Sequence, residues 1–350
     1  MNVISKALWL LPWLLLGTSV HAAEIGLALT SIHYGPYDDP SDCPEGLATG
    51  AREVFLRSLS PGPRKTFEDR DKRVGSQAMY LSTVLSNRRT ADGSDICVNP
   101  SAYEDPPMPT GQAKVSDGFD LDGGDQAQHC AHREFESPTG AKGIDNQLAR
   151  LTACIRGVRK TDNLKNQDND AFMRTGTAIT LILVGHVDDP RNDSDVTVSI
   201  FKSKDGFIKD GAGNPLPDAT MRADENPGFH SETHGRIMEG VLTTDPADIR
   251  MRDDRGDYYL RGARLRIALG TEGYADGILA GYYDAAAFWD SWSKRSNQQR
   301  ELGFSCPALY AALHQLADGY KDPVTGQCTA VSSVFNISAT QVFVIPPSGK

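Results

Sequence analysis

The chain lacks an excess of positive charge. It carries 36 lysine and arginine residues against 46 aspartate and glutamate residues, and its formal net charge at pH 7 is -10. It also lacks a basic stripe, and an acidic surface repels phosphate backbones. We therefore expect no nucleic-acid partner, whereas divalent cations and an unknown ligand or protein partner remain open.

Long hydrophobic runs are scarce as well. One apolar run, from Ala7 to Leu16, follows Lys6 and precedes the small-residue pattern VHA at residues 20–22. This order is typical of a secretory signal peptide, so residues 1–23 are predicted to be removed on export. No later segment reaches the roughly 18 apolar residues that a membrane helix needs. We therefore expect a soluble mature protein, periplasmic or secreted, without an integral membrane segment.

Closely spaced cysteine pairs are missing. The six cysteines form neither a CxxC nor a CxxCH motif, which argues against a thioredoxin-type redox site and against covalent haem. In an exported chain, an even number of cysteines predicts disulfides. Sequence alone does not choose the pairing, and we predict that each cysteine pairs with its nearest neighbour along the chain. The candidates are Cys43, Cys97, Cys130, Cys154, Cys306 and Cys328.

Residues with high strand propensity are concentrated in a few segments, which clusters of Asp, Asn, Gly and Pro separate. The connections are long and show no regular alternation of strand and helix. This pattern predicts a mainly β fold with peripheral helices, namely an antiparallel β-sandwich, of which a jelly roll is one form. The predicted strands are residues 25–34, 177–187, 195–203, 263–270 and 332–345.

Helical spacing of apolar residues predicts helices between these strands. Aromatic side chains share one face of the third helix, and we interpret that face as packing against a sheet. The proline-rich segment 99–118 suggests a boundary between a loop-rich and helical N-terminal element, residues 24–116, and a β-sandwich main domain, residues 117–350. The predicted helices are residues 47–59, 144–157, 284–296 and 306–319.

Carboxylates and glycines alternate in the segment GFDLDGGDQ, residues 118–126. Calcium takes about six to eight oxygen ligands, and glycines let a short loop wrap around the ion. An EF-hand is excluded, because Gly124 and Ala131 stand where that loop needs acids. We predict either an irregular structural calcium site or a solvated loop tethered by a disulfide. The calcium ligands would be Asp120, Asp122 and Asp125, with Asp117 and Asp145 as outer candidates.

Two polar residues stand where the predicted helix 144–157 begins. Asp145 and Asn146 can satisfy free backbone N–H groups there and complement the helix dipole. We interpret capping as their main role. The alternative is that Asp145 turns towards a metal ion held by the aspartates upstream.

Two histidines lie close to this segment. His129 and His132 are three residues apart, a spacing at which imidazoles can share zinc or copper. Cys130 between them is expected to be oxidised in an exported protein, so the sequence identifies no closed ligand set here.

A second histidine pair offers an alternative transition-metal site. His230 and His234 have the spacing of ligands on one helical turn, and His33 could join them in space. A zincin motif would need glutamate directly after the first histidine, where Ser231 stands. Exposed histidines in a long loop are the simpler interpretation.

Several longer motifs occur along the mature chain: DCPEG, DICVNP, DGFDLDG, CAHREFESPTGAKGIDNQ, LTTDPADIR and CTAVSSVFNISA. Their combination resembles a group of uncharacterised, predicted exported bacterial proteins, and the resemblance implies no activity or catalytic residue. The string GIDNQ is also similar to GVDN-type calcium repeats of some bacterial surface proteins.

Taken together, these patterns indicate an exported, disulfide-stabilised binding or accessory protein with a structural divalent cation in the acidic loop. The alternative is a secreted hydrolase or metal-dependent enzyme that uses His230 and His234, or carboxylates in a cleft. No GxSxG nucleophile elbow is present, and the sequence names no catalytic residue.

Overall fold

The structure is a computed structural model of the chain. It describes residues 23–35, 38–74, 95–124, 127–176, 178–252, 256–270, 273–293 and 298–348, with only the backbone for 70–74 and 300. The predicted signal peptide lies outside these ranges except for its last residue.

The secondary structure is dominated by strands. They are β1 (Ala23–His33), β2 (Thr180–Val187), β3 (Asp193–Lys202), β4 (Ala219–Arg222), β5 (His230–Met238), β6 (Val241–Thr244), β7 (Ala247–Arg252), β8 (Asp257–Leu269), β9 (Tyr274–Asp284), β10 (Gly319–Lys321) and β11 (Cys328–Ile345). The α-helices are α1 (Ala51–Ser58), α2 (Pro61–Val74), α5 (Gln147–Thr152), α6 (Leu164–Thr175), α7 (Ala285–Ser293) and α8 (Cys306–Leu316). Short 3-10 turns are η1 (Pro40–Asp42), η3 (Pro100–Ala102), η4 (Arg156–Val158) and η5 (Pro227–Phe229), and η6 (Gln299–Gly303) is a π-helix.

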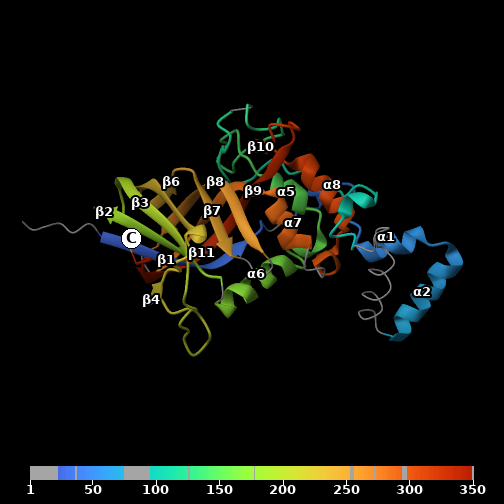
Figure 1. Ribbon diagram of the computed structural model, residues 1–350, viewed down its shortest axis with the longest axis horizontal. Helices are drawn as coiled ribbons and strands as arrows, with labels where there is room; N and C mark the ends of the chain where they lie inside the picture. Colours follow the sequence, from blue (N-terminus) through green and yellow to red (C-terminus); the bar gives the residue numbers. More distant parts are fainter. Residues whose placement is uncertain are drawn as a thin grey trace, which may run out of the picture.

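Eight strands form a closed antiparallel barrel (Figure 1). Neighbours pair in the order β1, β2, β3, β5, β6, β8, β9 and β11, and β11 then pairs with β1 through register partners such as Leu29 and Ala339. Strands β4, β7 and β10 pair with members of the ring at its margins. The mainly β, antiparallel prediction is thus confirmed.

The prediction of two stacked sheets was wrong. A sandwich has four free sheet edges, whereas here the first and last ring strands pair with each other and leave none in the ring. Both arrangements place alternate side chains in a core, so alternation along a strand does not distinguish them. The backbones of β8 and β9 approach closely at Gly277, where a Cβ would collide with the carbonyl oxygen of Arg266. A glycine at this position allows the close approach, which helps the sheet to curve.

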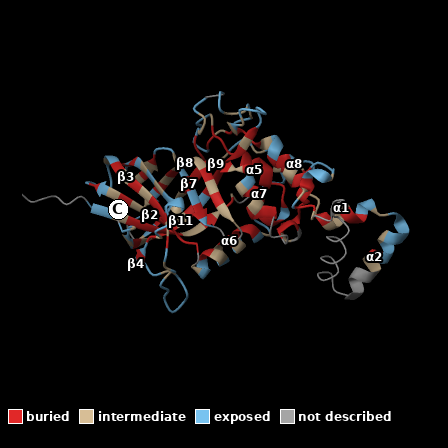
Figure 2. Ribbon diagram, in the orientation of Figure 1, coloured by how far each residue is buried: buried red, intermediate tan, exposed pale blue. Residues whose placement is uncertain are grey.

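The main hydrophobic core fills the barrel and continues into the helices (Figure 2). The long strands of the ring contribute alternate residues, for example Val196, Val198 and Ile200 of β3. Smaller clusters cover parts of the outer wall, one of them around Phe119, which packs on Ile278 and Val334. The loop that contains the acidic segment is therefore fixed to the outside of the barrel.

An aromatic cluster joins the barrel to helix α7, which follows directly on β9 (Figure 1). Trp292 stacks on Phe288 at a centroid distance of 4.9 Å, and its indole nitrogen donates a hydrogen bond to the hydroxyl of Tyr34 at 3.1 Å. Tyr34 meets the ring of Phe335 edge to face. The aromatic face of this helix thus packs against the sheet, as the sequence predicted.

The N-terminal segment is part of the same fold. β1 lies between β2 and β11 in the barrel, and Ile96 and Met108 belong to the main core. The boundary suggested near residue 116 therefore does not separate these residues from the main sheet. Among the described helices, none is both long and apolar enough to cross a membrane.

Three disulfides connect distant parts of the chain. They are Cys43–Cys154, Cys97–Cys306 and Cys130–Cys328. The nearest-neighbour pairing was wrong, because segments far apart in sequence lie side by side once the barrel closes. Helix α8 is joined to the segment before η3, and the acidic loop is joined to the start of β11. Such disulfides are typical of proteins in oxidising compartments.

Candidate functional site

The segment that follows the acidic loop, residues 128–132, lies against β10 and the residue that precedes it. Cys130 donates its backbone N–H to the carbonyl of Asp318 (2.7 Å), and Lys321 of β10 donates to the carbonyl of Gln128 (2.9 Å). Together with the disulfide between Cys130 and Cys328, these bonds hold residues 128–132 beside the barrel. A loop that the sequence suggested was solvated is thus attached at several points.

Asp145 holds the acidic loop in place. Asn146, the next residue, is the N-cap of α5 and accepts a hydrogen bond from the backbone N–H of Ala149, as predicted. The carboxylate of Asp145 is buried and turns the other way. Its Oδ2 atom accepts from the backbone N–H groups of Leu121 (2.7 Å) and Asp122 (3.3 Å), so it fixes the acidic loop.

His132 approaches the same carboxylate from a third segment. Its Nε2 atom lies 2.7 Å from Asp145 Oδ1, and its Nδ1 atom lies 3.0 Å from the carbonyl oxygen of Cys130 and 3.7 Å from Asp318 Oδ2. Burial by itself lowers the pKa of His132. The hydrogen bonds to Asp145 and Cys130, with the charges of Asp318 and Asp145, outweigh burial and raise this pKa to about 9.

Asp318 brings a second buried carboxylate to the imidazole. It is 1% exposed and directly precedes β10. Its Oδ1 atom accepts from the backbone N–H of Ser332 (2.7 Å), whereas its Oδ2 atom has no hydrogen-bond partner among the described residues. Burial raises the pKa of Asp318 to about 6, although the bond from Ser332 and the charge of His132 oppose this shift.

Two aromatic side chains border the same cluster. Tyr282 is 2% exposed, and its hydroxyl also has no hydrogen-bond partner in the described part of the chain. Burial, followed by the charges of Asp145, Asp318 and Asp122, raises the pKa of Tyr282 above its ordinary value. His129 stacks on Tyr282 at a centroid distance of 4.8 Å.

Asp122, His132 and Asp145 together have the geometry of a metal-binding group. Each offers one ligand atom, and these atoms all lie within 4.8 Å of one another. The two carboxylates and one imidazole come from three segments of the chain. Zinc and other transition metals accept both oxygen and imidazole nitrogen, whereas calcium takes oxygen ligands, so this donor set fits a transition metal better.

The other predicted calcium ligands have different surroundings. Asp120 accepts a hydrogen bond from the backbone N–H of Gly123 at 2.7 Å. Burial raises the pKa of Asp120, and so do the charges of Asp145 and Asp122, although the bond from Gly123 lowers it. The carboxylate of Asp117 pairs with Arg266 instead. Asp125 lies outside the described residues.

The second histidine pair lies on a strand. His230 and His234 stand on the outward-facing side of β5, where a separation of four residues spans about 13 Å rather than one helical turn. His230 lies 3.2 Å from Glu232, and His234 lies 2.8 Å from Asp195. His33 pairs separately with Asp170 at 2.6 Å. The three imidazoles thus have three different carboxylate partners.

Comparisons of the chain with protein-family models, curated proteins and solved structures found no match. Function must therefore be argued from the chemistry of the cluster.

Sequence reasoning identified part of this cluster. It named Asp122 as a calcium ligand and Asp145 as an outer candidate with capping as its main role, and it left His132 without a closed ligand set because Cys130 was expected to be oxidised. It missed Asp318 and Tyr282, which are far away along the chain. The only local signal at Asp318 was its place before Gly319, which suggested the end of a helix. A missing partner for a buried oxygen becomes apparent only in three dimensions.

Proposed function

We propose that this chain is an exported, disulfide-bonded binding or accessory protein in which Asp122, His132 and Asp145 hold a structural divalent transition-metal ion. The observation that carries the proposal is the convergence of their three ligand atoms within 4.8 Å. Three disulfides support an oxidising destination. Calcium, which the sequence suggested, would need oxygen ligands in place of His132.

The surroundings of the three residues support a metal centre. Asp145 and Asp318 are buried carboxylates, and a single imidazolium serves both of them. Asp318 lies on the Nδ1 side of His132, where an outer carboxylate would orient the ring while Nε2 binds the ion. Binding would require His132 to lose a proton and its Nε2 to bond the ion in place of Asp145.

A structural role follows from where the ligands lie in the chain. One ion would join the acidic loop, the segment of His132 and Asp145, which is two residues before α5, next to the disulfide Cys130–Cys328. Because these segments are not regular strands, the ion would supply cohesion that the sheet does not provide. The ion would then stabilise the surface that the loops form on the outside of the barrel.

The direct test is metal analysis combined with thermal unfolding. The chelated protein is titrated with zinc, manganese and calcium, and metal content is measured by mass spectrometry after gel filtration. A folded-state ion at a hundredfold excess over its Kd stabilises by about 2.7 kcal/mol, which shifts the Tm by roughly 4 °C or more. We expect one equivalent of zinc or manganese to produce this shift, and calcium to have a smaller effect.

Variants locate the ion. Asp122→Asn and His132→Gln should abolish the metal-dependent shift, while Asp117→Asn, in the same loop but paired with Arg266, should retain it. Asp122 is half-buried, so its variant is expected to fold and keeps the test valid if His132→Gln does not. No stoichiometric metal in the wild type, or an equal shift in all three variants, would refute the proposal.

An enzyme is the second candidate. Three protein ligands leave an open position on zinc, as in catalytic centres. If the cluster were catalytic, the manganese-loaded protein would show rapid exchange of bound water with solvent. A closed coordination shell would support the structural role.

A further inference from the structure

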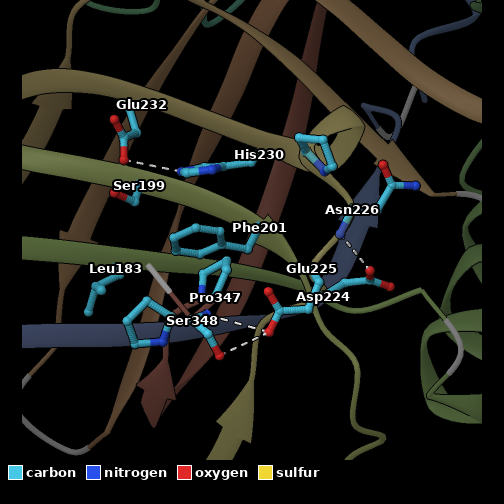
Figure 3. A pocket seen from close by; sticks show the side chains of 12 residues that line it. Leu183, Ser199, Phe201, Asp224, Glu225, Asn226, His230, Glu232, Pro347 and Ser348 are labelled. Atoms are coloured by element: carbon cyan, nitrogen blue, oxygen red, sulfur yellow. Dashed lines mark hydrogen bonds and ion pairs between the residues drawn. The ribbon is translucent and has the colours of Figure 1, made fainter. Parts of the chain in front are cut away.

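A pocket on the outer wall of the barrel lies away from the metal-binding group. Its floor is formed by outward-facing side chains of β2, β3 and β5, in register across Leu183, Ser199 and Glu232. The next row contains Phe201 and His230, whose rings lie 4.6 Å apart between centroids. The pocket has a volume of about 410 Å³, within the range of small-molecule sites (Figure 3).

The walls of this pocket are two segments that cross the ends of the strands. One is the stretch 224–227 before β5, and the other is 346–348 after β11. The backbone N–H and hydroxyl of Ser348 both lie 3.4 Å from Glu225 Oε1, so the two walls meet (Figure 3). The backbone N–H of Ala223 donates to the carbonyl of Ile345 at 2.9 Å, which ties their bases together.

The charge in this pocket is strongly one-sided. Three carboxylates line it, those of Asp224, Glu225 and Glu232, and no lysine or arginine is among its described lining residues. Lys202 lies 2.7 Å from Asp224 and neutralises that charge from beside the pocket. Glu225 and Glu232 are exposed, and their partners in the described part of the chain are a hydroxyl, a backbone N–H and an imidazole. The site therefore repels anions and attracts cations, in a protein whose net charge is already negative.

The apolar part of the lining restricts which cation would fit. Leu183, Phe201 and Pro347 offer hydrocarbon surface beside the exposed carboxylates of Glu225 and Glu232 (Figure 3). A hydrated metal ion would gain nothing from that surface, whereas an aliphatic chain ending in a charged nitrogen would use both parts. We propose that this pocket binds a small organic cation, a primary amine or guanidinium on a short aliphatic stem.

This proposal does not depend on the metal centre. The pocket lies on the wall formed by β2, β3 and β5, whereas the metal-binding group lies beside β10 and α5. All measurements can therefore be made in EDTA. Binding of an organic cation under those conditions would leave the metal proposal untouched, and the reverse also holds.

The test is calorimetric titration with 1,5-diaminopentane at low salt, with 1,5-pentanediol as the uncharged analogue and glutarate as the anionic one. We expect saturable binding of the diamine alone, weakened by added sodium chloride. Glu225→Gln and Glu232→Gln should each weaken binding about three- to fivefold, as expected for exposed ion pairs. Glu239→Gln, directly after the far end of β5, should leave binding unchanged.

Thermal melts confirm that each variant is folded before titration. Diamine binding that is undetectable at 10 mM, equal binding of the diol, or equal losses in Glu232→Gln and Glu239→Gln would overturn the proposal. The charge-reversal variant Glu232→Lys provides a second check and should remove binding altogether, because it replaces a carboxylate in the floor of the pocket with an ammonium group.

Discussion

Two groups of histidine and carboxylate residues in this chain differ in almost every physical respect. His132 is enclosed by Asp145 and Asp318, both 1% exposed, and its neighbours come from distant segments. His234 and Asp195 face solvent on adjacent strands, with side chains that are 60% and 73% exposed. The distance between nitrogen and oxygen is similar in both pairs, 2.7 Å and 2.8 Å.

The comparison indicates that burial, rather than the distance between the charged atoms, decides how much such a pair contributes to the free energy of unfolding. A charge pair in water gains little over its hydrated partners. In a poorly hydrated site, removing one member of such a pair strongly destabilises the fold, because the remaining charge is buried without a partner. Shifted pKa values are also found in the buried group, where the pKa values of His132, Asp318 and Tyr282 are all raised.

The largest effect on the free energy of unfolding is expected from the replacement of Asp145. Asp145→Ala removes the partner of His132 and leaves the N–H groups of Leu121 and Asp122 without their acceptor. We expect the free energy of unfolding to fall by about 3–5 kcal/mol, measured by urea denaturation in EDTA. A loss below 1 kcal/mol would show that the buried group has no more weight than the exposed one.

The next effect is a dependence of stability on pH. The pKa of His132, about 9 in the folded protein, lies above its ordinary value of 6.5, so the folded state binds this proton more tightly. The resulting stabilisation is fully present below pH 6.5 and is lost as the pH rises through 9. We expect a decrease on the order of 2–3 kcal/mol over this window in EDTA, measured by urea denaturation.

Asp318 contributes to the same profile in a lower window. Its pKa, about 6, lies above the ordinary 3.8, so ionisation of Asp318 costs stability between about pH 4 and 6, and this cost is constant above that range. His132→Asn is the control for the higher window, because it should flatten the profile between pH 6.5 and 9. It should also raise the pKa of Asp318 further, because it removes a charge that opposes that shift. An unchanged slope in that variant would assign the effect to other residues.

The smallest effect concerns the exposed pair. His234→Ala should change the free energy of unfolding by less than about 0.5 kcal/mol, because water replaces its bond to Asp195. Parallel denaturation of this variant and the wild type, with and without zinc, measures the change. A large loss, or a loss of bound metal, would contradict the distinction between the two groups.

Local features of the fold were predictable from the sequence. Strand-forming residues located five of the long strands, and the predicted helix over 306–319 corresponds to α8, Cys306–Leu316. The predicted helix over 144–157 was partly wrong. It consists of the short α5 and the 3-10 turn η4, although Ile144, Leu148, Leu151 and Ile155 are all buried as their spacing indicated.

Long-range features were not predictable from the sequence. Pairing of β1 with β11 joins residues about 310 positions apart, and no local pattern encodes which strand edge meets which. The disulfides and the cluster around His132 depend on that closure. The helical spacing of His230 and His234 was misleading for the same reason, because a four-residue separation has a different meaning on a strand.

Closure of the barrel has a consequence for the order of events during folding. β1 is near the beginning of the described chain and pairs on one side with β11, which is near its end. Until β11 has been made and has arrived, β1 and β9 each expose a row of unpaired N–H and carbonyl groups, and Cys130 has no partner. The disulfide Cys130–Cys328, and the hydrogen bond by which Ser332 of β11 holds Asp318 beside His132, would therefore be among the last contacts to form. A chain cut short before β11 would leave two free strand edges, which invite association with other chains.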